Sequence, residues 1–311
     1  MAFKEFPPPN YDYNVNKIVS AYKKAIRDIQ SELASLPVGD LRQAHVRATL
    51  ANAAKILSGI NKECELWVNE NVPIAARDGV ARTLVSLGEV KTVEEALTIV
   101  KFNRMNKAMV DAVIADTYAD LLAVTQNVDR KTRAAVRKAV SESMRANIAT
   151  GVMGRKTINK DTLDKVKETL ESATSTGIID SAGRRWKPEV YVDMVTRTKL
   201  MQTHIEATTN EAIAREAYYG VVSSHNARDA CRHVEGAIVK LTPDAPGDYP
   251  TVGELQMQSV IFHPGCRHVI SPIRDVDLLP DKVRSKADRQ TERANNVLKT
   301  GKRDPKDSEV K

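Results

Sequence analysis

Apolar side chains recur every three or four positions through much of the first 175 residues of this 311-residue chain. That spacing puts them along one face of an α-helix, whereas a strand would alternate them between two faces. The first stripe consists of Ile18, Tyr22, Ile26, Ile29, Leu33 and Leu36, and the second of Val46, Leu50, Ala53, Leu57 and Ile60. Aromatic residues make up only 5% of the chain. A core built mostly from Ala, Val, Leu and Ile suits packed helices better than a β-sandwich.

Local signals divide this region into separate helices. After the first stripe we expect helices over about residues 41–69, 75–87, 92–126, 130–150 and 160–173. Pro73 should end the first of these, because proline lacks the backbone N–H and clashes with the preceding turn. Thr92 is a typical N-cap, since acidic residues follow it in the first turn. Asp129 is expected to cap the helix that begins at Arg130.

The pattern changes at Gly177. Residues 178–186 are expected to form a short hairpin, and Pro188 should start a long helix that reaches about Tyr219. Short apolar, β-branched segments follow at residues 221–222, 237–241 and 269–270. The predicted fold is therefore mainly α, with a long-helix N-terminal body and a small α+β C-terminal domain that carries the Cys and His residues.

We expect four parts along the chain. Residues 1–12, with three consecutive prolines, should form an extended arm. Residues 13–176 should form the helical domain, and residues 177–280 the small α+β domain. Residues 281–311 are charged and poor in apolar side chains, which predicts a flexible tail.

A cluster of Cys and His residues marks the C-terminal domain. The triplet Cys-Arg-His occurs at residues 231–233 and again at 266–268, and His225 and His263 lie near the two copies. Thiolate and imidazole groups are natural ligands of Zn²⁺, which takes four of them in structural sites. Candidate ligands are Cys231, His233, His263, Cys266 and His268. Alternatively, the cysteines are small buried hydrophobic residues and the histidines hydrogen-bond to backbone groups.

An enzyme is the competing class of function. His233-Val234-Glu235 and the later Pro264-Gly265-Cys266 are similar to the signature of zinc deaminases, although Gly265 separates the proline from the cysteine. A metal-dependent nuclease based on the same Cys and His residues is the other enzymatic alternative.

Basic residues dominate the predicted helix over residues 130–150, and the chain carries a net charge of +7. The candidates for a DNA-facing surface are Arg130, Lys131, Arg133, Arg137, Lys138 and Arg145. The alternative is an ordinary solvated helix face.

No apolar stretch is long enough for a membrane span, and three cysteines cannot form a disulfide framework. We therefore expect a soluble protein that is made in the cytoplasm and has no membrane partner.

The segment from Trp186 to His268 resembles a known family. It contains Arg228-x-x-Cys231, then Gly236, and later the run His263-Pro264-Gly265-Cys266-Arg267-His268. In these motifs the chain resembles the phage minor capsid proteins, relatives of the head-morphogenesis proteins typified by the F protein of phage Mu.

This resemblance implies a structural protein of the virion head that takes part in head morphogenesis and DNA packaging and has no catalytic site. Its expected partners are the portal protein and other head proteins, with several copies around the portal vertex or on the inner head surface, and packaged double-stranded DNA. Arg228, Gly236 and Arg267 are then motif residues that fix the fold of the C-terminal domain.

Overall fold

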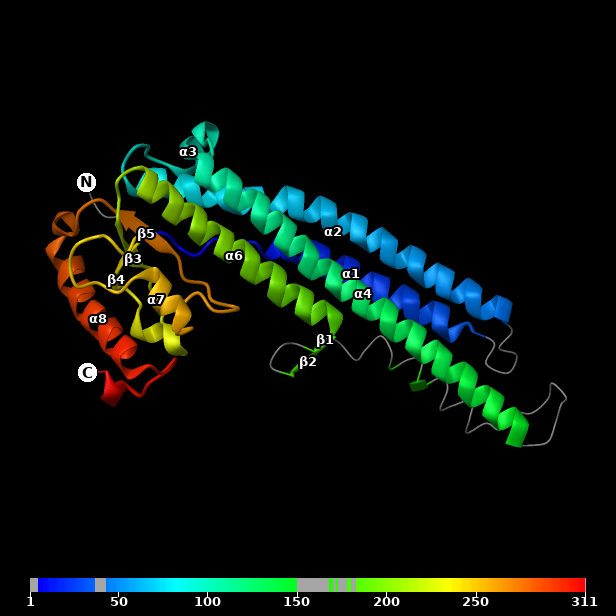
Figure 1. Ribbon diagram of the computed structural model, residues 1–311. Helices are drawn as coiled ribbons and strands as arrows, with labels where there is room; N and C mark the ends of the chain where they lie inside the picture. Colours follow the sequence, from blue (N-terminus) through cyan, green and yellow to red (C-terminus); the bar gives the residue numbers. More distant parts are fainter. Residues whose placement is uncertain are drawn as a thin grey trace. The chain divides into compact units, whose positions relative to one another are not determined.

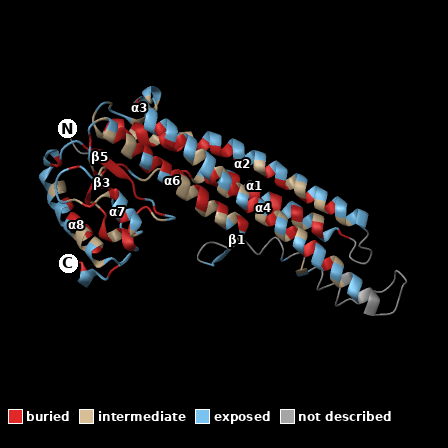
Figure 2. Ribbon diagram, viewed as in Figure 1, coloured by how far each residue is buried: buried red, intermediate tan, exposed pale blue. Residues whose placement is uncertain are grey.

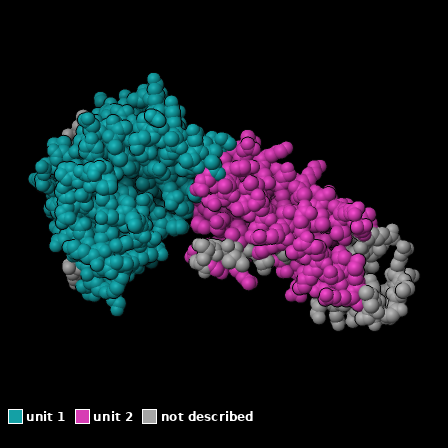
Figure 3. Space-filling view, viewed as in Figure 1, with its two compact units in different colours: residues 1–11, 69–115, 197–311 teal, residues 12–68, 116–196 magenta. Residues whose placement is uncertain are grey.

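A computed structural model describes residues 5–36, 43–149, 168–169, 172, 178–179 and 183–310. These residues form a mainly α-helical protein with a three-stranded sheet and a two-stranded hairpin (Figure 1). This confirms the predicted fold class. The chain divides into two compact units (Figure 3). We call residues 12–68 and 116–196 the helical unit, and residues 1–11, 69–115 and 197–311 the C-terminal unit. The C-terminal unit thus also contains residues 69–115, which the sequence assigned to the helical domain.

Three helices build the core of the helical unit: α1 (Asp12–Ala34), the first part of α2 (Gln43–Ser86) and the later part of α4 (Arg104–Ala149). The predicted stripe on α1 is buried, as Figure 2 shows. Tyr22 Oη donates a hydrogen bond to the carbonyl of Leu121 (2.8 Å) and accepts one from Cys64 Sγ (3.2 Å). These bonds tie the three helices together around a buried tyrosine.

Two predicted helix boundaries are wrong. Pro73 lies inside α2, and Asp129 lies inside α4, where its carboxylate pairs with Arg133 (2.7 Å). Val72, Ala75 and Ala76 around the proline are fully buried, so packing outweighs a local cost of roughly 3 kcal/mol. The helix predicted over residues 92–126 is instead interrupted, because α3 (Val93–Ile99) ends before α4 begins at Arg104. The predicted cap Thr92 does form, since its side chain accepts the N–H of Glu95.

In the C-terminal unit, α2 crosses α6 (Pro188–Ala214) at close range, because Gly79 has no side chain there. Nearby, the buried side chains of Tyr11 and His204 meet the half-buried carboxylate of Asp78. Tyr11 Oη lies 3.2 Å from Asp78 Oδ2 and 3.2 Å from His204 Nδ1. Part of the predicted arm is therefore fixed to the helices. Phe6, also in the arm, is buried in a core cluster with residues of α2 and with Ala96.

The sheet that carries the Cys and His loops is antiparallel, in the order β4-β3-β5. Its strands are β3 (Tyr219–Val222), β4 (Ile238–Lys240) and β5 (Ile270–Ile273), close to the predicted segments. The short helix α7 (Val252–Met257) precedes β5. The expected hairpin is also present, because β1 (Ile178–Ile179) pairs with β2 (Arg185–Trp186).

The predicted flexible tail is wrong for the residues described. Residues Asp281–Thr300 form helix α8, with Ala287, Thr291, Ala294 and Val297 buried against the sheet and its core. Val310, near the C-terminus, is buried in the same core. The buried face of α8 is made of small and β-branched side chains, so a count of large apolar residues does not reveal it.

The expected helix over residues 160–173 lies almost entirely outside the described residues. Among those that are described, no helix is both long enough and apolar enough to cross a membrane.

Candidate metal centre

Cys231 is placed by a short 3-10 helix, η1 (Ala230–His233). Asp229 caps this helix by accepting the backbone N–H of Cys231 (3.2 Å), as expected for an aspartate at an N-cap. Cys231 itself is only 1% exposed and belongs to the hydrophobic core of the unit.

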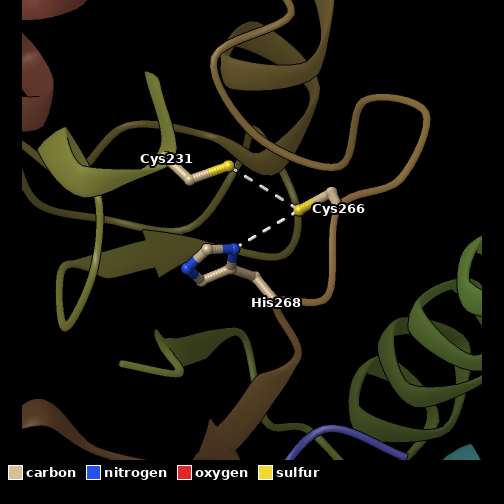
Figure 4. A group of neighbouring side chains, drawn as sticks. All are labelled: Cys231, Cys266 and His268. Carbon is tan, nitrogen blue, oxygen red and sulfur yellow. Dashed lines mark hydrogen bonds between the residues drawn. The ribbon is translucent and has the colours of Figure 1, made fainter. Parts of the chain in front are cut away.

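Cys266 and His268 come from the loop between α7 and β5. The turn His263-Pro264-Gly265-Cys266 closes with a hydrogen bond from Cys266 N–H to the carbonyl of His263 (2.9 Å). Proline at the second position and glycine at the third, with φ of +82°, is the pattern of a type II turn. His268 follows two residues later, immediately before the sheet. The loop therefore directs Cys266 and His268 toward Cys231 (Figure 4).

The three ligand atoms lie within 4.8 Å of one another, and the two distances from Cys266 are close to those of a tetrahedral zinc site. Cys231 Sγ is 3.7 Å from Cys266 Sγ, and Cys266 Sγ is 3.4 Å from His268 Nδ1. With Zn–S of about 2.3 Å and Zn–N of about 2.0–2.1 Å, tetrahedral geometry requires about 3.8 Å between sulfurs and about 3.6 Å between S and N. All three side chains are buried, and the two cysteines are free thiols. The donor set therefore fits zinc.

His263 is the nearest candidate for a fourth ligand. Its Nε2 lies 3.2 Å from Cys231 Sγ and 3.1 Å from Asp229 Oδ2, so these three form a second group of possible ligands. His263 Nδ1 lies 3.1 Å from the carbonyl of Pro264. Because the Asp229 carboxylate can only accept, Nε2 carries a hydrogen in this arrangement, and His263 would bind a metal through Nε2 only after losing it.

Hydrogen bonds within the centre shift the pKa values of Cys231, Cys266 and His268. A hydrogen bond from Cys231 lowers the pKa of the Cys266 thiol well below its usual value, and His268 lowers it further. The same bond raises the pKa of Cys231. Burial acts to lower the pKa of His268, but its contacts with Cys266 and Glu235 raise it overall. These shifts favour the thiolate form at Cys266 and the thiol form at Cys231, so that Cys231 is the donor in the contact between the two sulfurs.

His233, the fifth candidate ligand, lies elsewhere. Its side chain is fully buried, with Nδ1 3.1 Å from Arg293 Nε and Nε2 3.3 Å from Asp304 Oδ1. Because a guanidinium can only donate, Nδ1 accepts and Nε2 donates, which leaves no lone pair for a metal. The prediction of His233 as a ligand is therefore not supported, and the deaminase-like pairing of His233 with Cys266 does not form.

Glu235 and Asp229 are functional candidates that the ligand prediction missed. Glu235 contacts His268 (3.0 Å), and the ring of His225 stacks on that of His268 with centroids 4.0 Å apart. Carboxylates are common throughout the sequence, so their residue type gives no signal. The sequence offered Glu235 only within the deaminase-like segment 233–235, and its contact with His268 is what identifies it as a partner of a candidate ligand.

Two of the three motif residues lie beside the centre. Arg228 and Arg267 are exposed and line a cavity of about 310 Å³ above Cys231, Cys266 and His268. Gly236 has φ of +78°, which favours glycine, and its N–H donates to the carbonyl of Val222 (3.0 Å). This turn leads from η1 and Glu235 into strand β4.

The candidate DNA-facing residues all lie on α4, in the helical unit. Arg130, Arg137, Lys138 and Arg145 are exposed, whereas Lys131 and Arg133 are half-buried. Arg133 is paired with Asp129, and Lys138 lies 3.8 Å from Glu142. The exposed charges recur at helical spacing along one helix, but acidic partners neutralise part of the surface.

Comparison with known proteins identifies the family. The family model described as Phage minor capsid protein 2 matches residues 41–301, which is well over half of the chain. No curated protein and no solved structure matches this sequence. The match includes both Cys-Arg-His segments and most of both units. The chain therefore belongs to the Phage minor capsid protein 2 family and is a minor structural protein of the phage virion, with other head proteins as its partners.

Proposed function

We propose that this minor capsid protein is stabilised by one zinc ion, binds the portal vertex or inner head surface in several copies, and contacts packaged DNA. Zinc is supported by one observation above all: buried ligand atoms of Cys231, Cys266 and His268 lie within 4.8 Å of one another, and both distances from Cys266 Sγ are close to tetrahedral values. Family membership supports attachment within the head. The exposed basic side chains of α4 support contact with DNA phosphates.

The role we propose for zinc is structural. Its ligands come from two loops that are 35 residues apart in sequence, so one ion would join them next to a small three-stranded sheet. Structural zinc sites are closed by four protein ligands, and we propose His263 as the fourth because its Nε2 lies 3.2 Å from Cys231 Sγ. Zinc binding would release protons, because both cysteines must bind as thiolates.

Metal analysis of protein purified without chelator tests this role. We expect about one zinc per chain in the wild type, and a large loss in Cys266→Ser, with a lower melting temperature. Cys64→Ser is the matched control, because Cys64 is also a buried thiol but bonds to Tyr22 in the helical unit. Wild-type protein with well under one zinc per chain would contradict the proposal.

The DNA contact is tested by charge removal on α4. Replacing Arg130, Arg137 and Lys138 by alanine should weaken binding to double-stranded DNA and reduce the dependence of affinity on salt. The control replaces three exposed basic residues of α8, namely Lys282, Arg289 and Lys299. Equal losses in both variants would indicate attraction by net charge alone and would remove α4 as a specific surface.

The position in the head is tested on purified virions. Quantitative mass spectrometry should find a few to a few dozen copies per particle, and cross-linking should join this chain to the portal protein. Cross-links to other head proteins alone would place the protein away from the portal vertex.

A further inference from the structure

Glu235 has an unusual position for a carboxylate. It lies between η1 and β4, is only 8% exposed, and directs its side chain toward the loop that carries His225 and toward His268. A buried carboxylate is costly unless several donors satisfy it. Three donors do so here, and all three use the same oxygen.

The donors reveal which way the His268 ring is held. Oε1 of Glu235 accepts the backbone N–H groups of His225 (2.9 Å) and Ala227 (3.0 Å) and lies 3.0 Å from His268 Nε2. Backbone N–H groups can only donate, so Oε1 acts as an acceptor and His268 Nε2 must carry a hydrogen. The other ring nitrogen, Nδ1, then faces Cys266 Sγ at 3.4 Å.

We propose that Glu235 is the positioning residue of the zinc centre: it holds His268 in the form that binds metal through Nδ1 and ties the loop of His225 to that ligand. This inference rests on the zinc site proposed above. Histidine ligands commonly donate their second N–H to a carboxylate, which fixes the orientation of the ring and increases its basicity. Glu235 makes this contact and also anchors two backbone groups of a neighbouring loop.

The loop contact links metal binding to local order. His225 N–H is bonded to Glu235, and the His225 ring stacks on His268 at 4.0 Å with an angle of 32° between the planes. Release of Glu235 from His268 should therefore loosen residues 225–227 as well as the metal ligand. A residue that only filled space in the core would not have this pair of effects.

The test combines zinc affinity with the state of the His268 ring. Zinc competition against a chromophoric chelator should show that Glu235→Ala binds about 10–100-fold more weakly than the wild type. Glu235→Gln keeps an acceptor oxygen without the charge, so its affinity for zinc should lie between those of the wild type and Glu235→Ala. Glu211→Gln is the control, because Glu211 is another buried carboxylate, bonded to Asn103 and Arg215 away from the zinc ligands.

Nitrogen-15 NMR of histidine-labelled protein supplies a second measurement. In wild-type protein with zinc, His268 should show a metal-bound Nδ1 and a protonated Nε2, and Glu235→Gln should retain this pattern with broader signals. Binding through Nε2, or unchanged zinc affinity in both Glu235 variants, would overturn the inference and leave the zinc site intact. Absence of zinc from the wild type would refute the proposed zinc site itself, and this inference with it.

Discussion

The crossing of α2 and α6 predicts opposite outcomes for the same substitution at two glycines of one helix. A Cβ atom added at Gly79 would lie 2.4 Å from the backbone carbonyl oxygen of His204, whereas one added at Gly59 meets nothing within 4 Å. The obstacle at Gly79 is backbone, so no change of side-chain rotamer can relieve it. The two helices would have to separate by about 1 Å, which disturbs a close-packed core.

The expected magnitudes follow from packing and helix propensity. Overpacking a core costs about 1–3 kcal/mol, and alanine regains up to about 1 kcal/mol over glycine within a helix. Because the contact is with a backbone carbonyl, the overpacking cost of Gly79→Ala should lie near the upper end of that range. After the gain in helix propensity, the free energy of unfolding should fall by about 1–2 kcal/mol. Gly59→Ala has only the propensity gain and should stabilise the protein by up to about 1 kcal/mol.

Thermal unfolding followed by far-ultraviolet circular dichroism measures both variants. A change of 1 kcal/mol shifts the melting temperature by about 2–4 °C in proteins of roughly 150–250 residues. Gly79→Ala should therefore melt several degrees lower and Gly59→Ala slightly higher than the wild type. If Gly79→Ala matched or exceeded the wild type, the close approach of α2 and α6 would be wrong.

Two further predictions concern pH and the C-terminus. Burial lowers the pKa of His204, so as the pH falls through about 6.5 the unfolded chain takes up this proton before the folded chain does. The free energy of unfolding, measured by urea titration at a series of pH values, should decline as the pH falls, and less steeply in His204→Gln. Equal dependence on pH in the two proteins would exclude His204 as a cause. Deletion of residues 302–311 removes buried Val310 and the carboxylate partners of Arg232 and Arg293, and should cost at least about 1.5–3 kcal/mol. Unchanged denaturant unfolding would show that this segment contributes nothing to stability.

Helix content could be predicted from the sequence, but helix boundaries could not. The stripe from Ile18 to Leu36 is buried as its periodicity requires, and the Thr92 cap forms as predicted. Pro73 and Asp129 were expected to interrupt helices and do not. Their local preferences amount to a few kcal/mol at most, and the buried neighbours of each residue in the folded protein outweigh them.

The candidate zinc centre was likewise predictable from the sequence only in part. The doubled Cys-Arg-His triplet identified Cys231, Cys266 and His268 because thiolate and imidazole groups were concentrated in one short region. Sequence symmetry also suggested His233 as the counterpart of His268. The structure separates them, because the first triplet lies on a 3-10 helix and the second in an extended segment before β5.

The sequence by itself determined the mainly helical fold, the small sheet and the residues from which a metal centre could be built. These features depend on local periodicity and residue type, which are properties of short segments. Only the tertiary structure decided that α8 is part of the core, that His233 faces Arg293 and Asp304, and that Glu235 faces His268. The contacts of His233 and Glu235 join residues 33 to 71 positions apart, and the packing of α8 brings it against a sheet built from three separate segments, so all of them depend on how the chain packs.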